Sequence, residues 1–237
     1  MNKALPPLSL IQTRVLSVLI EKERTVPDTY PLTLNMLVSG CNQKTSRDPI
    51  MNISESEAQA AIDELKRLSL VMETSGGRVM RYSQNAKRVL VVPSESLALL
   101  TGLMLRGPQT AGELRIGCER LCKFSDISAV EGFLNELADR DGGGLVRELP
   151  RQAGSRENRW MHLLSGPPTE EMLREASSST VRYASSAELH ADSAVTELRE
   201  RVARLEAELA LLRRIVTDLC SQLGVEAPAS PQALASS

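Results

Sequence analysis

Apolar and polar positions between residues 8 and 85 predict three helices followed by two strands. In "LSLIQTRVLSVLIEKERT" the apolar residues recur every three or four positions, the period of an amphipathic helix. Two prolines in "TVPDTYP" end it, and Thr33 can cap a short second helix, "LNMLVSGC". Ser54 and Glu57 form a capping box before a third helix, "ESEAQAAIDELKRLSL". "LVMETSGGRVMRYS" then predicts a hairpin that turns at its two glycines.

The same order of elements recurs from residue 94. "SESLALLTGLMLR", "TAGELRIGCERL" and "DISAVEGFLNELADR" predict three helices, and "LVRELPRQAGSRENRWMHLL" predicts a hairpin with a longer tip. When Ile62 is aligned with Leu134, an offset of 72 residues, Ser54 falls on Asp126, another good N-cap. We interpret this repeat as tandem winged-helix domains in a mostly α chain with small β hairpins, followed by a C-terminal coiled-coil helix.

Residues 188–223 carry the most regular apolar pattern of the chain. Val and Leu recur at spacings that alternate between three and four residues, with Leu at every d position. This pattern is typical of parallel two-stranded coiled coils. We therefore expect a homodimer; the alternative is a helix that folds back onto its own protein. The residues of this dimerisation seam are Val195, Leu198, Val202, Leu205, Leu209, Leu212, Val216, Leu219 and Leu223.

These patterns predict five segments. The first winged-helix domain is expected at 1–90 and the second at 91–166. A Pro-, Ser- and Glu-rich linker at 167–187 precedes the coiled-coil helix at 188–223, and a disordered tail is expected at 224–237.

Composition agrees with a helical, soluble class. The chain is 42% hydrophobic but only 3% aromatic, which favours packed helices over an aromatic-rich β sandwich. No apolar stretch approaches the roughly 18 residues of a membrane helix, and no secretory pattern opens the chain, so we expect a cytoplasmic protein without membrane contact. The net charge is −2, and residues 1–165 carry 21 Lys and Arg against 19 Asp and Glu. A nucleic-acid binder is often much more basic than that.

Cysteine and histidine usage gives no support to a metal site or an enzyme. Four cysteines without a signal peptide indicate reduced thiols. Cys118 and Cys122 could share one helical face as half of a metal site, but neither His162 nor His190 lies at a ligand spacing. We predict no metal and no cofactor. The chain also lacks a Gly-rich phosphate loop, an HExxH motif and a nucleophile elbow, so we do not expect an enzyme.

Three segments resemble the YceH family of bacterial proteins, which carries a domain of unknown function. They are "YPLTLNMLVSGCNQKTSRDPIMNISE", "RGPQTAGELR" and "LPRQAGSRENRWMHLLSG". The resemblance implies tandem winged-helix domains and carries over no activity. Where the family usually has a basic residue and a His in the second helix of the second unit, this chain has Gly117 and Cys122.

A winged-helix fold makes duplex DNA the first ligand to consider. The third helix of such a domain commonly enters the major groove, while the preceding loop and the wing contact the backbone or the minor groove. The candidate residues by position are Asn42, Gln43, Lys44, Thr45, Ser46 and Arg47 in the loop, Gln59 on the third helix, Arg78 and Arg81 in the first wing, and Arg151, Arg156 and Arg159 in the second.

Two features argue for other interpretations. The third helix carries four carboxylates that would repel phosphate: Glu55, Glu57, Asp63 and Glu64. The loop "NQKTSRDP" also fits a structural role, in which Asn42 caps the second helix, Asp48 and Pro49 form a turn and Arg47 pairs internally. We interpret Trp160 as core packing on the last strand.

Two function classes follow. The first is a dimeric DNA-binding protein, such as a transcriptional regulator. The second is a protein-interaction scaffold without DNA binding, similar to the ScpB-type subunits of chromosome-condensing complexes, in which tandem winged helices bind partner proteins. Fold alone does not choose between them.

Overall fold

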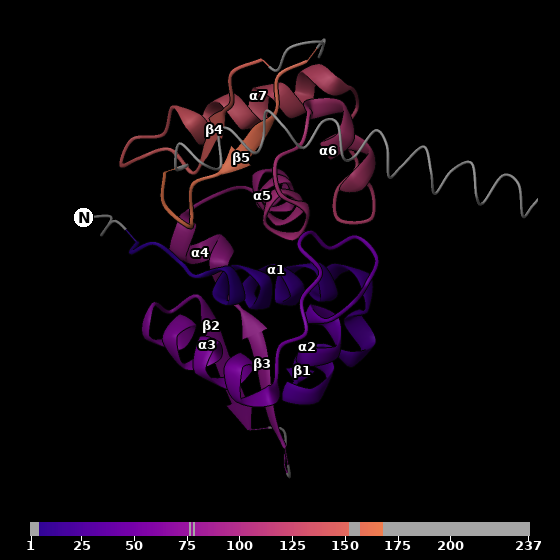
Figure 1. The fold of residues 1–237 in the computed structure, drawn as a ribbon, viewed down its shortest axis with the longest axis vertical. Helices are drawn as coiled ribbons and strands as arrows, with labels where there is room; N and C mark the ends of the chain where they lie inside the picture. Colours follow the sequence, from indigo (N-terminus) through magenta and orange to yellow (C-terminus); the bar gives the residue numbers. More distant parts are fainter. Residues whose placement is uncertain (1–4, 76, 78, 152–156, 168–237) are drawn as a thin grey trace, which may run out of the picture. The chain divides into compact units, whose positions relative to one another are not determined.

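The computed structural model describes residues 5–167, except 76, 78 and 152–156 (Figure 1). They belong to the first of the two units into which the chain divides, Met1–Ser177. The predicted coiled-coil seam, the tail and all but the first residue of the predicted linker lie outside the described residues, as do Arg78 and Arg156. The described part is a mixed helical structure with small antiparallel sheets.

The first repeat begins with α1 (Leu10–Thr25). It starts two residues later than its apolar period suggests, because Ser9 and Gln12 form a reciprocal capping box. A 3-10 turn, η1 (Pro27–Thr29), and a two-residue strand, β1 (Leu32–Thr33), lead into α2 (Leu34–Cys41) and α3 (Glu55–Arg67). The predicted Thr33 cap of α2 and the predicted capping box of α3 are both confirmed.

A hairpin completes the first repeat. Its strands are β2 (Val71–Ser75) and β3 (Met80–Gln84), and β1 pairs with the other edge of β3, so the sheet order is β1-β3-β2. The sheet is antiparallel throughout. The apolar period did not predict β1 or the five-residue helix α4 (Ala86–Leu90), since elements this short show no clear periodicity.

The second repeat has the same order of elements. It consists of α5 (Ser94–Arg106), α6 (Ala111–Gly117), α7 (Ile127–Ala138) and the hairpin β4 (Val146–Glu148) and β5 (Trp160–His162). Gln109 forms an isolated antiparallel bridge with Trp160. This bridge occupies the position that β1 has in the first sheet, because it pairs with the edge of β5 that β4 leaves free. Asp126 caps α7, as the alignment with Ser54 predicts.

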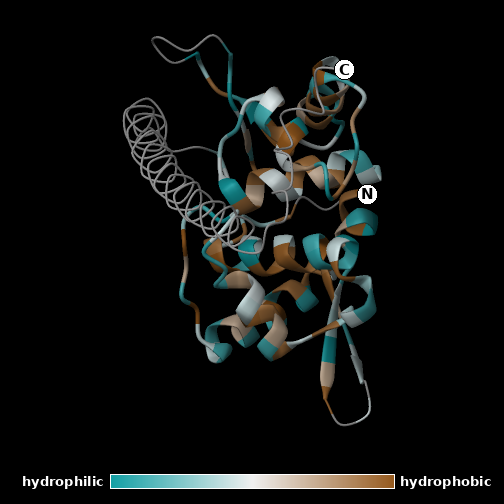
Figure 2. Cartoon of the chain, turned by 90° about the vertical axis from the view of Figure 1, so that its right-hand side faces the viewer, coloured by the Kyte–Doolittle hydropathy of each residue, from teal (hydrophilic) through white to brown (hydrophobic). Residues whose placement is uncertain are grey.

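The two repeats share one hydrophobic core, in which α1 packs against α5. In α1 the consecutive residues 13–20 are all buried, and in α5 so are residues 96–105. An amphipathic helix would bury one stripe only; these two helices are covered all round because each also packs on its own repeat, α1 on α2 and α3, α5 on α6 and α7. Figure 2 shows apolar residues along these central helices and many polar residues on the outer ones.

Several polar residues are buried by this arrangement and bond locally. The hydroxyls of Thr13, Ser17 and Thr101 donate to carbonyl oxygens of their own helices, which removes the cost of burying them. In the described part of the chain, no helix has the length and apolarity that crossing a membrane requires.

Candidate functional site

The polar loop between α2 and α3 was predicted as a DNA contact, and its basic residue Arg47 lies inside the protein. The Arg47 side chain is 0% exposed and meets the carboxylate of Glu21 on α1 through both terminal nitrogens, Nη1 to Oε1 at 3.1 Å and Nη2 to Oε2 at 2.6 Å. Its remaining N–H groups donate to the Gly40 and Ser46 carbonyl oxygens and to Gln43 Oε1. All five guanidinium donors are therefore used, and these contacts match the structural interpretation of the loop.

Asn42 closes the same loop. Its Nδ2 donates to the Ile53 carbonyl oxygen at 2.9 Å, and its Oδ1 accepts from the Ile53 backbone N–H at 2.8 Å. The side chain thus joins the end of α2 to the residue just before the N-cap of α3. Both polar atoms of the Asn42 amide are hydrogen-bonded, so this side chain holds the two ends of the loop together.

A second buried cation, Arg14 on α1, supports the loop from beneath. Its Nη1 donates to the Cys41 carbonyl oxygen at 3.2 Å and its Nη2 to the Pro49 carbonyl oxygen at 2.8 Å. Burial, and secondly the nearby positive charge of Arg47, lower the pKa of Arg14. No sequence motif predicts a role for Arg14, because the residue lies within an apolar helical segment and the sequence does not show which loop packs against that segment.

The loop also reaches the second repeat. The Asp48 backbone N–H donates to the Leu105 carbonyl oxygen, in the last turn of α5, at 2.8 Å. One polar segment therefore contacts α1, bridges α2 to α3 and bonds to α5. The loop is a structural joint between the repeats.

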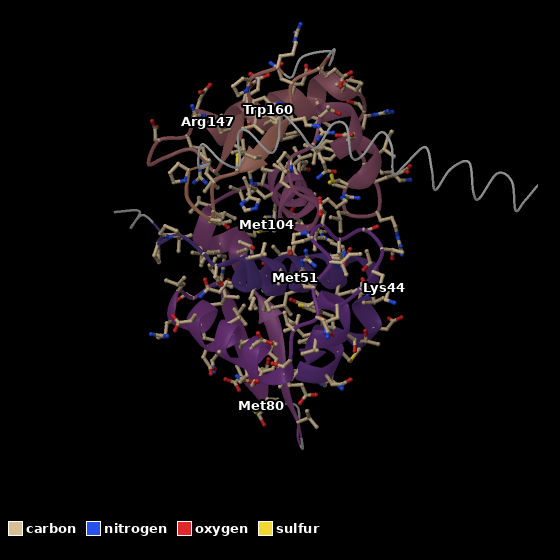
Figure 3. The ribbon with its side chains drawn as sticks, in the orientation of Figure 1. Lys44, Met51, Met80, Met104, Arg147 and Trp160 are labelled. Atoms are coloured by element: carbon tan, nitrogen blue, oxygen red, sulfur yellow. The ribbon has the colours of Figure 1, made fainter. Side chains whose placement is uncertain are left out.

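The remaining loop candidates lie at the surface. Gln43, Lys44 and Thr45 are exposed. Gln43 Oε1 also accepts from Lys22 Nζ at 3.4 Å, whereas the described residues offer Lys44 no hydrogen bond or ion pair. Figure 3 shows Lys44 at the rim of the molecule. Lys44 is thus the loop cation that is available to an external ligand.

Gln59, the residue predicted to read base edges from α3, is engaged within the fold. Its Nε2 donates to Asp63 Oδ1 at 3.0 Å, and its Oε1 accepts from the Tyr82 hydroxyl, also at 3.0 Å. Tyr82 belongs to β3, so the Gln59 amide oxygen is bonded to the sheet, and the residue is half-buried. An incoming base would have to replace both bonds.

The wing arginines differ from one another. Arg81 donates from Nη1 to the Pro31 carbonyl oxygen at 2.7 Å and is half-buried. Arg159 Nη2 lies 3.7 Å from Glu113 Oε1. Arg151 is exposed, and among the described residues its Nε donates one long bond, to Asn158 Oδ1 at 3.5 Å. Arg147 on β4, which the sequence reasoning did not select, is also exposed and has no hydrogen bond or ion pair within the described residues.

The third helix of each repeat presents an acidic surface. On α3 the exposed residues include Glu55, Glu57 and Asp63, and its two basic residues pair with carboxylates, Lys66 with Glu73 and Arg67 with Glu64. On α7 there is no Lys or Arg between Ile127 and Ala138. Its solvent face and its two ends carry four exposed acids: Asp126, Glu131, Glu136 and Asp139.

An exposed apolar pair accompanies the acidic surface of α7. Ile116 on α6 is 73% exposed and Ile127 at the start of α7 is 42% exposed. Gly112 on α6 faces α7, since a Cβ atom added there would come 3.9 Å from Ile127 Cδ1. Isolated exposed apolar residues are common on protein surfaces, but two on neighbouring helices give a partner something to bury.

The two buried cysteines of the described region are poor nucleophiles, and its histidine is held in the neutral form. Burial raises the pKa of Cys41 to about 12 and that of Cys118 to about 11, and it lowers the pKa of His162 to about 4. Among the described residues, no three His, Cys, Asp or Glu side chains come together as a metal ion would require. Trp160 is buried on β5, which confirms its interpretation as core packing (Figure 3).

Comparison with known proteins places these features in a family. A family model described as "Protein of unknown function, DUF480" matches residues 8–155. A UPF0502 protein of Dechloromonas aromatica is 54% identical over 218 residues, which cover 92% of this chain and 98% of that relative. A UPF0502 protein of an Acidovorax species is 55% identical over 222 residues, covering 92% of this chain and 95% of the relative.

Proposed function

This chain belongs to the family described as a protein of unknown function, DUF480, and we propose that it is a tandem winged-helix scaffold that binds a basic protein partner. We also propose that the segment 188–223 pairs two copies through a parallel coiled coil, so that each assembly presents two sets of binding surfaces. The expected setting is the cytoplasm.

The order of elements supports the winged-helix assignment. In both repeats a helix is followed by a short strand or bridge, two helices and a hairpin. In both, the short segment pairs with the second hairpin strand, which gives the orders β1-β3-β2 and Gln109-β5-β4. The third helix and the hairpin are then the recognition helix and the wing of each domain.

The observation that carries the proposal is the acidic character of both recognition helices. A helix that enters a DNA groove lies against phosphates, whose charge repels exposed carboxylates. Here α3 exposes Glu55, Glu57 and Asp63, and α7 has no basic residue. A Lys- or Arg-rich protein surface has the complementary potential.

The internal engagement of the loop supports the same proposal. Arg47 and Asn42, two of the predicted DNA contacts of the loop, use their polar groups to hold the loop. The exposed Ile116 and Ile127 add apolar area beside the acids of α7, and a buried apolar centre with a charged rim is the usual composition of a protein interface.

Charge reversal on the two recognition helices tests the proposal. The wild-type protein would be affinity-purified, with its bound partners, from the organism that produces it. It would be compared with an Asp63→Lys, Glu131→Lys, Glu136→Lys variant. The control variant reverses the charge of Asp28 and Glu119, exposed acids outside α3 and α7. We expect one or more stoichiometric partners with basic surfaces to be lost from the recognition-helix variant and retained by the control. Identical partner sets in all three samples would refute the proposal.

DNA binding is the second candidate, and one observation favours it. Lys44, Arg147 and Arg151 are exposed cations, and within the described residues none has a carboxylate partner. In a dimer these groups would occur twice, so several phosphates could be contacted through the loop and the second wing without the recognition helices. Such binding would be sequence-independent, because phosphate contacts position a protein without reading bases.

A further inference from the structure

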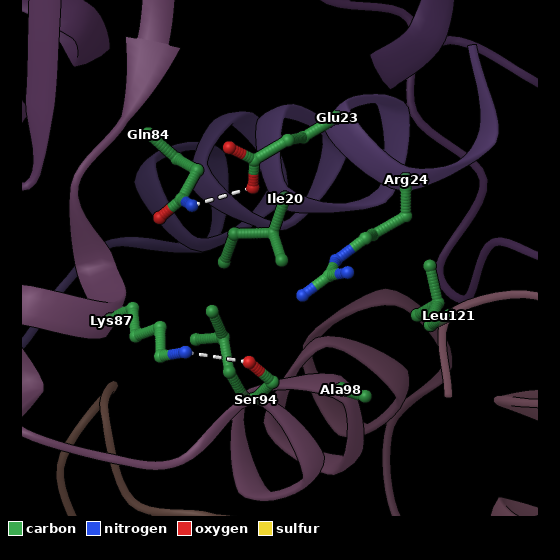
Figure 4. Close-up of a pocket in the computed structure, with 9 residues that line it drawn as sticks. Ile20, Glu23, Arg24, Gln84, Lys87, Ser94, Ala98 and Leu121 are labelled. Atoms are coloured by element: carbon green, nitrogen blue, oxygen red, sulfur yellow. Dashed lines mark hydrogen bonds between the residues drawn. The ribbon is translucent and has the colours of Figure 1, made fainter. Parts of the chain in front are cut away.

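A cavity of about 310 Å³ lies where the two repeats meet (Figure 4). We call it the seam cavity; it is bounded by the last turns of α1, the start of α5, the start of α4 and Leu121. None of the candidate DNA contacts that lie in the described part of the chain lines it. Its volume is at the lower end of the range in which proteins hold small molecules.

The seam cavity joins an apolar floor to two cations. Ile20, Leu97 and Leu121 provide the apolar part. Arg24 extends its guanidinium into the space between α1 and α5, as Figure 4 shows, and makes no hydrogen bond or ion pair within the described part of the chain. Lys87 reaches the cavity from α4 and donates to Ser94 Oγ at 2.7 Å.

Glu23 is the one carboxylate among the described residues that line the cavity, and it is already engaged. Glu23 Oε2 accepts from Gln84 Nε2 at 2.7 Å on the side away from Arg24 (Figure 4). Two cations therefore face one hydrogen-bonded carboxylate, which leaves the lining with a net positive charge. Glu95 in the first turn of α5 is near enough to affect the electrostatics around Cys122, as Arg24 does, but it does not line the cavity.

We propose that the seam cavity binds a small organic carboxylate with a short apolar tail. The Arg24 guanidinium has the planar pair of N–H donors that a carboxylate accepts, and Lys87 supplies a second charge from the opposite wall. The tail lies on Ile20, Leu97 and Leu121, since burying it there removes apolar surface from water. This site is separate from the proposed partner surface, which lies on α3, α6 and α7.

The position of the cavity gives binding a measurable consequence. Arg24 and Ile20 belong to α1, the first helix of one repeat, and Ser94 and Leu97 to α5, the first helix of the other. A ligand held by both stabilises the packing of α1 on α5, and a ligand that binds only the folded state raises the unfolding temperature.

The test is titration calorimetry on the full chain with hexanoate, in parallel with hexanamide, acetate and inorganic phosphate. We expect hexanoate to bind at least tenfold more tightly than each of the other three, because hexanamide lacks the charge and acetate and phosphate lack the tail. We also expect hexanoate, and not hexanamide, to raise the unfolding temperature at equal ionic strength.

Variants assign the site. Arg24→Gln should weaken hexanoate binding about tenfold and Lys87→Gln severalfold, whereas Arg88→Gln, an exposed residue of the same α4 that does not line the cavity, should leave it unchanged. Arg24 is exposed, so its variant should fold normally. Equal binding of hexanamide, equal binding of phosphate, no hexanoate binding, or full binding by Arg24→Gln would each overturn the proposal.

Discussion

Arg47 and Glu21 form a two-point ion pair, with Nη1 3.1 Å from Oε1 and Nη2 2.6 Å from Oε2, that fixes the loop between α2 and α3 to α1. The Arg47 side chain is fully enclosed, while Glu21 keeps 17% of its side-chain surface exposed. The polarity of "NQKTSRDP" is therefore explained largely by contacts inside the protein.

Removing one member of this pair should be costly. We expect Arg47→Ala to lower the free energy of unfolding by about 3 kcal/mol, because a mostly buried carboxylate and several carbonyl oxygens lose their donor. Lys44→Ala, three residues earlier in the same loop, should change it by less than about 0.5 kcal/mol. Urea denaturation of both variants gives the comparison. Similar losses in the two would mean that the ion pair is not what holds the loop.

Gly102 on α5 faces Cys118 too closely to accept a side chain. A Cβ atom there would lie 2.7 Å from Cys118 Sγ and 3.2 Å from Leu114 Cδ2. Gly102→Ala should therefore destabilise by about 1–3 kcal/mol, although Ala favours a helix. Gly132→Ala on α7 is the matched control, since nothing lies within 4 Å of its added Cβ, and it should stabilise by up to about 1 kcal/mol.

A double-mutant cycle checks the cause of the Gly102 effect. In a Cys118→Ala background the sulfur is gone, so most of the penalty of Gly102→Ala should disappear, with a coupling of about 1–2 kcal/mol. Additive effects of the two substitutions would show that the clash lies elsewhere.

Stability should fall in mild acid because of His162. Burial lowers the pKa of His162 to about 4, and within the described residues its Nδ1 has no hydrogen-bond partner. The unfolded chain takes up this proton near pH 6.5, so the contribution is fully present above that pH and declines as the pH falls toward 4. Between pH 7.5 and 5.5 we expect His162 to account for about 1 kcal/mol of lost stability.

A His162→Gln variant isolates the contribution of His162 to the pH dependence of stability. Denaturant unfolding of wild type and variant at both pH values should show the smaller pH dependence in the variant. The same pH dependence in both proteins would assign the loss to other groups.

The C-terminal segment should make the protein a dimer. Leu205→Asp with Leu212→Asp places charges at two d positions of the predicted seam and should give a monomer by light scattering, since apolar seam contacts supply most of a coiled coil's stability. Ala207→Asp with Arg214→Asp changes two predicted outward f positions and should leave the dimer intact. The concentration should be tens of micromolar, because a coiled coil this short is only marginally stable. A wild-type protein that is monomeric at this concentration would contradict the predicted coiled-coil dimer.

Duplex DNA should bind weakly. With acidic recognition helices we expect no binding to a mixed-sequence duplex tighter than about 100 μM at roughly 100 mM salt, measured by fluorescence anisotropy. Micromolar binding with a steep salt dependence would favour the second candidate. In that case Arg147→Ala with Arg151→Ala should reduce the slope by about 2, at about 0.9 per phosphate contact, and weaken all sequences equally.

Much of the local structure could be predicted from the sequence alone. The helices α2 and α5 begin and end where their apolar segments indicate, and the N-caps Thr33, Ser54 and Asp126 are all confirmed. These features depend on residues a few positions apart, so the local sequence contains the information that determines them. The recurrence of the element order, seen at the offset of Ile62 from Leu134, has the same origin.

Tertiary structure decided which polar side chains remain available to a ligand. Arg47 and Lys44 are both cations in one polar loop, yet one is enclosed by Glu21 and the other is exposed. That difference, like the burial of Arg14 and the seam cavity beside Arg24, depends on how α1 packs on α2, α3 and α5. Such contacts join residues far apart in the sequence, 26 positions for Arg47 and Glu21 and 27 for Arg14 and Cys41, and the periodicity of one segment carries no information about the element that will face it.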